Sequence, residues 1–287
     1  MRQKRVLLAG ASGCVGFEVL QLLQEEACEI HTLSRSKKRA QKCENYATKV
    51  HIANAMKPKS LVGICEDMDL VVSCLGASVG LHAGQRAAYF SVDYQANLNL
   101  LHEAKRAGVK RFLYLSVQPS EGYAHTKYVQ AHLAFEKELE RSGLDYSIVR
   151  PTGLYTAFDD LVDMAKRGPI FLIGKGDAKT NPVDHRDVAE VLVKHLWEGP
   201  EKIPVGGPDI VTRKEIGLRV FEALDKKPRF LSVPAWGMRF GSLMLRWLHP
   251  RLSQLLEFAV AVNISEATAP KVGKRGLLPY FSERSAP

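Results

Sequence analysis

Residues 5–16 read RVLLAGASGCVG, and this stretch predicts the fold of much of the chain. A short apolar run is followed by three glycines at intervals of three, and then by apolar residues at helical spacing. This succession is typical of a buried strand, a tight turn and a helix. In it Gly10 makes the turn, Gly13 lets a ligand approach the backbone, and Gly16 lets the helix pack closely against the strand.

The glycine turn predicts a site for a dinucleotide. Amide groups in the first turn of a helix have no acceptor within the helix, and the positive end of the helix dipole lies there, so anions such as a pyrophosphate bind at this point. Glycines also occur in ordinary turns. Here, however, a strand precedes the motif and a helix follows it, which is the context that a dinucleotide fingerprint requires.

The end of the next strand indicates the preferred cofactor. Residues 29–33 read as that strand, and Ser34 and Arg35 follow it. An NAD-preferring site has a carboxylate about 20 residues after the glycine turn, whereas this chain has Arg35, with Lys37 and Lys38 behind it. A guanidinium binds a 2′-phosphate in bidentate fashion, so we expect NADP(H). In the alternative, these cations form an exposed helix start that binds nothing.

Strands and helices alternate through residue 150, which predicts an α/β fold with a Rossmann-type, doubly wound parallel sheet. Long helices are expected at about 86–107 and 123–141. The composition changes after Pro151, where glycines and prolines are frequent. We therefore divide the chain into a core at 1–150 and a smaller portion at 151–287 that is interleaved with the core.

Several motifs besides the glycines resemble the short-chain dehydrogenase/reductase superfamily, in particular its extended and atypical branches. The resemblance is strongest to the NmrA-like and complex I accessory-subunit-like groups, which include reductases as well as NADP(H)-binding sensors and assembly factors that catalyse nothing. It implies that 151–287 is the substrate-binding portion. The motifs follow one another along the chain at 10–16, 93–97, 104–112, 150–153, 183–189 and 206–215.

The resemblance also implies the residues of the site. The predicted catalytic residues are Tyr123, Lys127 and Ser116. Asn54 takes the place of an aspartate that binds the adenine amino group in relatives. Cofactor contacts are expected from the glycine turn and from the ends of the following strands, namely Gly10, Ser12, Gly13, Cys14, Val15, Gly16, Ser34, Arg35, Lys38, Asn54, Cys74, Leu75, Gly76, Ser116, Lys127, Pro151 and Thr152.

Tyr123 and Lys127 are four residues apart, which places both side chains on one face of a helix. In reductases of the superfamily the tyrosine gives a proton to a substrate carbonyl, the lysine binds ribose and lowers the tyrosine pKa, and a serine such as Ser116 holds the substrate oxygen. Only six residues separate Ser116 from Tyr123, fewer than active relatives lead one to expect. Ser120 is a second candidate for the serine, and Tyr-x-x-x-Lys also occurs by chance on surface helices.

Composition and charge exclude several classes of protein. Forty basic and 31 acidic residues give a net charge of +9, which suits phosphorylated ligands or anionic surfaces, but the excess is spread along the chain, so nucleic-acid binding is not expected. Five cysteines without a C-x-x-C pair predict a reduced, cytoplasmic setting, and the nine histidines lack metal-ligand spacing, so no metal is expected. The charged N-terminus imitates a signal peptide, but its apolar run is too short, and no segment is long enough to span a membrane.

The family pattern fades from Pro234 onward. Residues 236–248 interleave tryptophans and other apolar residues with Arg239 and Arg246, and a second apolar segment covers 252–262. Amphipathic helices of this kind cover a hydrophobic pocket or form an oligomer interface, which we favour here. Contact with an anionic membrane surface is the alternative.

Together these features predict an NADP(H)-dependent oxidoreductase of the short-chain dehydrogenase/reductase type. Its expected substrate is an apolar small molecule with a carbonyl or similar group. The alternative is an NADP(H)-binding sensor or assembly factor without turnover, linked to quinones or to a membrane. The short connection between Ser116 and Tyr123 is the observation that keeps this alternative open.

Overall fold

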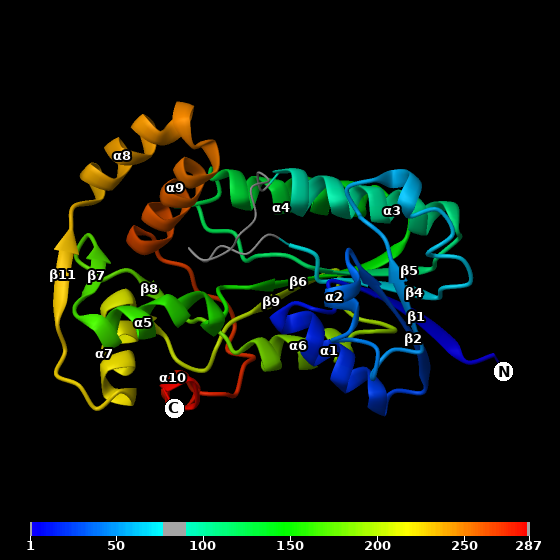
Figure 1. Ribbon diagram of the computed structural model, residues 1–287, viewed down its shortest axis with the longest axis horizontal. Helices are drawn as coiled ribbons and strands as arrows, with labels where there is room; N and C mark the ends of the chain where they lie inside the picture. Colours follow the sequence, from blue (N-terminus) through cyan, green and yellow to red (C-terminus); the bar gives the residue numbers. More distant parts are fainter. Residues whose placement is uncertain (1, 77–89, 286–287) are drawn as a thin grey trace.

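The computed structural model describes residues 2–76 and 90–285, and in it seven parallel strands form one central sheet (Figure 1). Their order is β3-β2-β1-β4-β5-β6-β9, and every neighbouring pair is parallel. The order reverses direction beside β1, as in doubly wound folds. The strands are β1 Lys4–Ala9, β2 Cys28–Ser34, β3 Lys49–Ile52, β4 Leu70–Ser73, β5 Arg111–Leu115, β6 Asp145–Pro151 and β9 Lys202–Val205.

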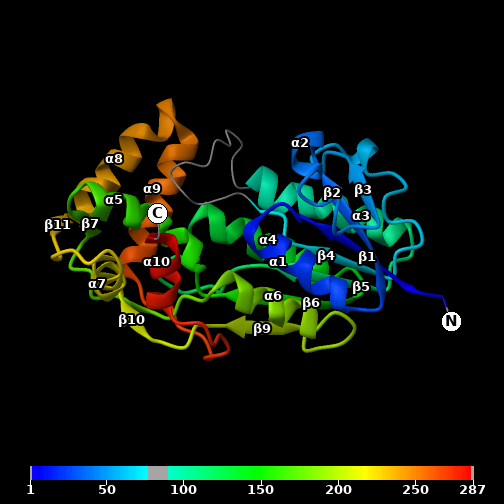
Figure 2. The same cartoon turned by 60° about the horizontal axis from the view of Figure 1, so that its bottom comes forward.

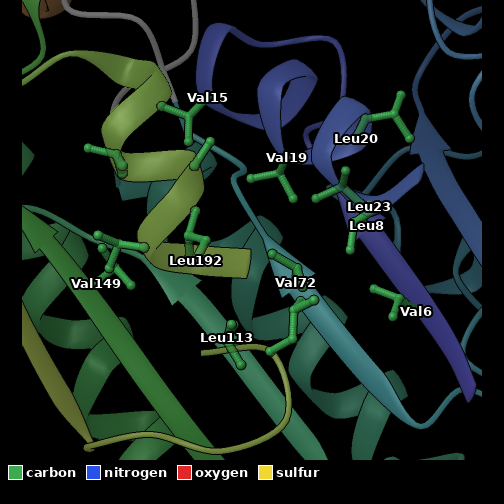
Figure 3. Close-up of a cluster of buried hydrophobic side chains, with 14 of the residues drawn as sticks. Val6, Leu8, Val15, Val19, Leu20, Leu23, Val72, Leu113, Val149 and Leu192 are labelled. Carbon is green, nitrogen blue, oxygen red and sulfur yellow. The ribbon is translucent and has the colours of Figure 1, made fainter. Parts of the chain in front are cut away.

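Helices cover both faces of this sheet, which explains why its strands read as nearly continuous apolar runs. Helices α1 (Cys14–Leu22) and α6 (His185–Lys194) lie on one face, and α3 (Asn97–Arg106) and α4 (Lys127–Glu140) lie on the other (Figure 1). Figure 3 shows the core beneath α1 and α6, where Val19 and Leu192 meet Val72, Leu113 and other strand residues. The predicted α/β fold is confirmed.

The second half of the chain builds a lobe beyond the carboxyl ends of the strands (Figure 2). Three helices and short strand pairs surround a core of their own that includes Tyr155, Phe221 and Phe281. The chain also returns to the main sheet through β9 and to its helical layer through α6. The lobe contains α5 Asp159–Arg167, β7 Ile170–Ile173, β8 Lys179–Thr180, β10 Val211–Thr212, α7 Arg213–Ala223, β11 Phe230–Val233 and α10 Leu277–Ser285.

Two further helices form a hairpin on this lobe. They are α8 (Ala235–Leu248) and α9 (Pro250–Ile264), which lie side by side (Figures 1 and 2). Helix α9 also packs on α4 through Phe258 and Tyr128, whose ring centroids are 4.7 Å apart. None of the helices within the described ranges combines the length and hydrophobicity that crossing a bilayer needs.

Two predicted helices differ from those that the structure describes. The helix expected at 86–107 is a π-helix over Phe90–Ala96 followed by α3, and its predicted start lies outside the described residues. The helix expected at 123–141 begins at Lys127. Before it, the amide of Tyr123 donates to the carbonyl of Ser120, and Thr126 donates through both its amide and its hydroxyl to the carbonyl of Tyr123. These turns satisfy the backbone groups locally, so residues 121–126 form turns rather than helix.

Candidate functional site

The glycine turn at the end of β1 has the geometry that a close backbone approach requires. Gly10 has a φ of +87°, and a Cβ there would lie 2.5 Å from the carbonyl oxygen of Cys74 on the neighbouring strand. A Cβ on Gly16 would overlap the carbonyl oxygen of Gly10. Because a side chain at either position would force the turn away from β4 or from α1, these glycines hold the helix start close to the sheet.

Helix α1 begins at this turn with its first amides available to a ligand. Gly13 is the N-cap and donates to the Gly10 carbonyl at 3.0 Å, no side chain caps the helix, and its first turn holds no acidic residue. Gly13 and Cys14 are exposed and Ser12 is half-buried, whereas the side chain of Val15 is buried in the core. The first helical bond runs from the amide of Phe17 to the carbonyl of Gly13, so the amides of residues 14–16 and the positive end of the helix dipole lie at the carboxyl edge of the sheet.

A cluster of cations follows β2 on the same edge. Arg35 and Lys38 are exposed, and burial together with the positive charge of Arg35 lowers the pKa of Arg39. Lys38 and Arg39 lie on the short helix α2 (Lys37–Ala40). Ser34 is buried, and its carbonyl accepts from the amide of Ala53 at 2.9 Å. Two exposed cations thus lie at the point where the sequence predicts a partner for a 2′-phosphate.

The ends of the other strands place the remaining predicted residues along this edge. Asn54 accepts a hydrogen bond from the amide of Met56 at 3.0 Å, so one lone pair of its side-chain oxygen is already used. Cys74, Leu75 and Gly76 follow β4, and burial raises the pKa of Cys74 to about 12. Pro151 ends β6 and is buried. Thr152 uses its hydroxyl to donate to the carbonyl of Asn181 at 2.6 Å.

The structure does not place Tyr123 and Lys127 on one helical face. Tyr123 precedes α4 and is 1% exposed, and its hydroxyl donates to the carbonyl of Gln118 at 2.9 Å. Burial raises the pKa of this tyrosine to about 12. Lys127 is the first residue of α4 and is exposed. The helical pairing predicted from the four-residue spacing is therefore wrong, because the turn at 121–126 takes Tyr123 off the helix. The role of Tyr123 as a proton donor stays a prediction.

Ser116 follows β5 at the expected place, but its side chain points into the protein. Its hydroxyl donates to Glu136 at 2.5 Å, and Glu136 in turn pairs with Arg150, whose Nε lies 3.0 Å away. Ser116 and Glu136 are both buried. This network joins the end of β5 to α4 and β6. Ser120, the second candidate, donates to the carbonyl of Glu266 at 2.7 Å.

A second buried polar pair joins β5 to the same helix, and the sequence analysis did not predict it. The hydroxyl of Tyr114 lies 2.6 Å from Nδ1 of His132, and burial lowers the pKa of this histidine to about 4. His132 and Glu136 are four residues apart on the face of α4 that also buries Val129 and Leu139. A polar residue at a helical position where the periodicity predicts an apolar one can be found by inspecting the sequence. Here two such residues, His132 and Glu136, belong to two hydrogen-bond networks that join α4 to the sheet.

In the part of the chain that the structure describes, histidine, cysteine and carboxylate side chains form no cluster of three that could hold a metal ion. The five cysteines are unpaired, and only Cys14 is exposed.

An uncapped helix start, a glycine turn and a cluster of cations at the carboxyl edge of a parallel sheet define a dinucleotide-binding protein of the Rossmann class. Comparison of the sequence with family models assigns the family within this class. A family model described as NAD(P)H-binding matches residues 10–198, and the chain belongs to this NAD(P)H-binding family. The family predicted from the glycine turn and the later motifs is confirmed.

Of two curated relatives, one is named as a reductase and the other as an assembly factor. A chloroplastic divinyl chlorophyllide a 8-vinyl-reductase of Cucumis sativus is 28% identical over 270 residues, which cover 86% of this chain and 63% of that protein. The chain thus spans less than two thirds of the length of this reductase. A photosystem II assembly factor of Guillardia theta is 23% identical over 266 residues, which cover 90% of this chain and 83% of the factor.

A solved structure shares the fold over almost the whole chain. It is an NADPH-dependent quinone oxidoreductase from Escherichia coli in complex with NADPH, with a TM-score of 0.75 and 18% identity. The alignment covers 97% of this chain and 99% of that protein. The fold, including the lobe beyond the sheet, is therefore one that NAD(P)H-binding reductases use.

Proposed function

We propose that the protein is an NADPH-dependent reductase of an apolar small molecule with a conjugated acceptor such as a quinone. The observation that carries the proposal is the glycine turn with its uncapped helix α1, followed on the same edge by Arg35 and Lys38. The bound cofactor supplies a hydride. The chain's part is to hold the pyrophosphate on the amides of residues 14–16 and the extra phosphate on the cations after β2.

Apolar residues beside the predicted catalytic segment support an apolar substrate. Tyr123, Val129 and Ala261 are buried together, and Tyr128 and Phe258 pack against them. This cluster joins the loop after β5 to α4 and α9, beyond the carboxyl ends of the strands. Its half-buried members Tyr128 and Phe258 would offer an apolar surface to a ligand bound at this edge, which favours a hydrophobic ring over a charged or sugar-like ligand.

The state of Tyr123 favours a conjugated acceptor over a simple ketone. A ketone needs a proton donor at its oxygen as the hydride arrives, but the Tyr123 hydroxyl already donates to Gln118 and burial raises its pKa to about 12. A quinone or a conjugated vinyl group spreads the developing charge over its own π-system. Reductases of such groups are among the named relatives.

The test measures NADPH oxidation with a panel of quinones, using Gly13→Asp as the defective variant. A Cβ at Gly13 meets only the carbonyl oxygen of Gly10, at 3.3 Å, so the fold should accept it with a small shift. An aspartate at this N-cap takes the free amides and repels a pyrophosphate, so we expect both NADPH binding and turnover to be lost while the unfolding temperature is kept or raised.

Gly168→Asp serves as the matched control, because nothing lies within 4 Å of an added Cβ there and the residue lies in the lobe after α5. It should bind and oxidise NADPH as the unchanged protein does. If Gly13→Asp binds NADPH normally, the assigned cofactor site is wrong. If NADPH binds but no member of the panel is reduced, the reductase proposal fails and the cofactor site stands.

A non-catalytic, cofactor-binding assembly factor is the second candidate. It is favoured by the position of Tyr123 off the α4 face, and one relative is named as an assembly factor. Steady turnover with any panel member that is lost in Gly13→Asp would remove this candidate.

A further inference from the structure

Helix α8 presents large apolar side chains to solvent along one face. Trp236 and Trp247 are 76% and 89% exposed. Together with Phe240 and Leu243 they follow the i, i+4, i+7, i+11 spacing of a single helical stripe. Met244 and Leu248 flank this stripe and are also exposed. We refer to these six side chains as the α8 stripe.

The opposite face of α8 is fixed to the protein, so the stripe points outward in the folded state. Ser242 is buried against α9 and its hydroxyl donates to the carbonyl of Ser253 at 2.9 Å. Figures 1 and 2 show α8 on the outside of the hairpin in both views.

The charges on α8 are all positive. Arg239 and Arg246 are exposed, are seven residues apart and lie along one edge of the stripe, whereas the helix contains no acidic residue. The chain as a whole carries +9. Tryptophan and arginine beside an apolar face are the residues that favour the interface of a bilayer, since tryptophan suits the headgroup level and arginine reaches anionic headgroups.

We propose that α8 lies in the plane of an anionic membrane surface, with the stripe in the outer part of the bilayer and Arg239 and Arg246 at the headgroups. A second copy of the chain fits the α8 stripe less well than a membrane does. A helix of 14 residues is about 21 Å long and about 10 Å wide, a footprint well below the roughly 800 Å² that each partner of a stable dimer buries. The inference does not depend on turnover, because α8 contributes nothing to the assigned cofactor site.

The experiment is flotation of the purified full chain with vesicles of phosphatidylcholine alone and with vesicles containing phosphatidylglycerol. We expect binding to the anionic vesicles only, weakened by salt. Intrinsic fluorescence should shift to the blue, and Trp236→Phe with Trp247→Phe should remove most of that shift. The third tryptophan, Trp197, has Lys4 over its ring at 4.1 Å and reports on the core.

Charge reversal gives the matched pair of variants. The double variant Arg239→Glu with Arg246→Glu should lower vesicle binding at least about tenfold, while NADPH binding and the unfolding temperature stay unchanged. The control, Lys105→Glu with Lys137→Glu, changes the net charge equally at exposed positions of α3 and α4 and should keep vesicle binding.

Three results would overturn the proposal. The first is the absence of binding to anionic vesicles by the folded protein. The second is an equal loss of binding in both charge-reversal variants, which would show a general charge effect. The third is a concentration-dependent dimer that the stripe substitutions Trp236→Ser and Trp247→Ser abolish, measured by analytical ultracentrifugation without vesicles, which would assign the stripe to a second copy of the chain.

Discussion

At the scale of single residues, we expect Arg35 to decide between NADPH and NADH. It is exposed beyond the end of β2, where a carboxylate would bind the ribose hydroxyls of NAD, and Arg39 lies close enough for its pKa to be lowered by Arg35. A hydrogen bond to a charged group contributes about 1.5–3 kcal/mol. We therefore expect Arg35→Ala to lower NADPH affinity by about one to two decades and leave NADH affinity unchanged. Titration of both cofactors by intrinsic fluorescence measures the ratio.

Lys105→Ala is the control for this titration, because it removes an exposed cation from α3, away from the cofactor edge. It should not change the ratio of the two affinities. An unchanged ratio in Arg35→Ala itself would contradict the assignment of the 2′-phosphate site.

Tyr123 is the other residue whose role one substitution can settle. Its hydroxyl donates to the Gln118 carbonyl from a buried position, and its pKa is raised to about 12. We expect Tyr123→Phe to lose about 1 kcal/mol of unfolding free energy through the missing hydrogen bond, and to keep turnover within about threefold. Denaturant unfolding and NADPH oxidation measure the two quantities. A loss of about 100-fold in kcat at unchanged KM would instead support the proton-donor role.

At the scale of elements, α4 makes stability depend on pH. His132 is buried on this helix against Tyr114, and its pKa is lowered from the usual 6.5 to about 4. The unfolded chain then binds a proton more readily than the folded chain does between these two values. This stabilisation is complete above pH 6.5 and is lost as the pH falls toward 4, by up to about 3 kcal/mol.

His31, His51 and His185 also have lowered pKa values, so they contribute to the same pH dependence of the unfolding free energy. Comparing the unchanged protein with His132→Gln isolates the contribution of His132. Glutamine can still bond to Tyr114 but does not titrate. We expect the unfolding free energy of the variant to fall less steeply between pH 6.5 and 4. His102→Gln, at an exposed position of α3, is the control. Equal slopes in all three proteins would show that His132 is not the group responsible.

At the scale of the whole molecule, Asp187 ties the C-terminal segment to the core. It lies in the first turn of α6. The structure shows that Asp184 caps the helix through the amide of Arg186. Asp187 is buried and accepts from the amides of Lys274 and Arg275 at 2.8 and 3.0 Å, and it also pairs with the Arg275 guanidinium.

We expect Asp187→Asn to lower the unfolding free energy by about 1.5–3 kcal/mol, because charge-assisted bonds to a buried carboxylate are lost. Denaturant unfolding measures the loss. Glu190→Gln is the control, since Glu190 is a more exposed partner of the same Arg275 and should matter by less than about 1 kcal/mol. Equal effects of the two substitutions would mean that the buried bonds to residues 274 and 275 are not what fixes the segment.

The sequence by itself determined the strands, the glycine turn, the capping box at Thr212 and Glu215, and the NAD(P)H-binding family. These features depend on residues close together in the chain, where apolar periodicity and glycine spacing act locally. Tertiary structure decided where side chains point. Ser116 turns toward Glu136, Tyr123 leaves the α4 face, and the α8 stripe stays uncovered. Ser116 meets a partner 20 residues further along the chain, and the stripe is exposed because of how α8 packs on the rest of the molecule, so apolar periodicity records neither. Tyr123 is instead held by turn hydrogen bonds to near neighbours, which the four-residue spacing to Lys127 does not reveal.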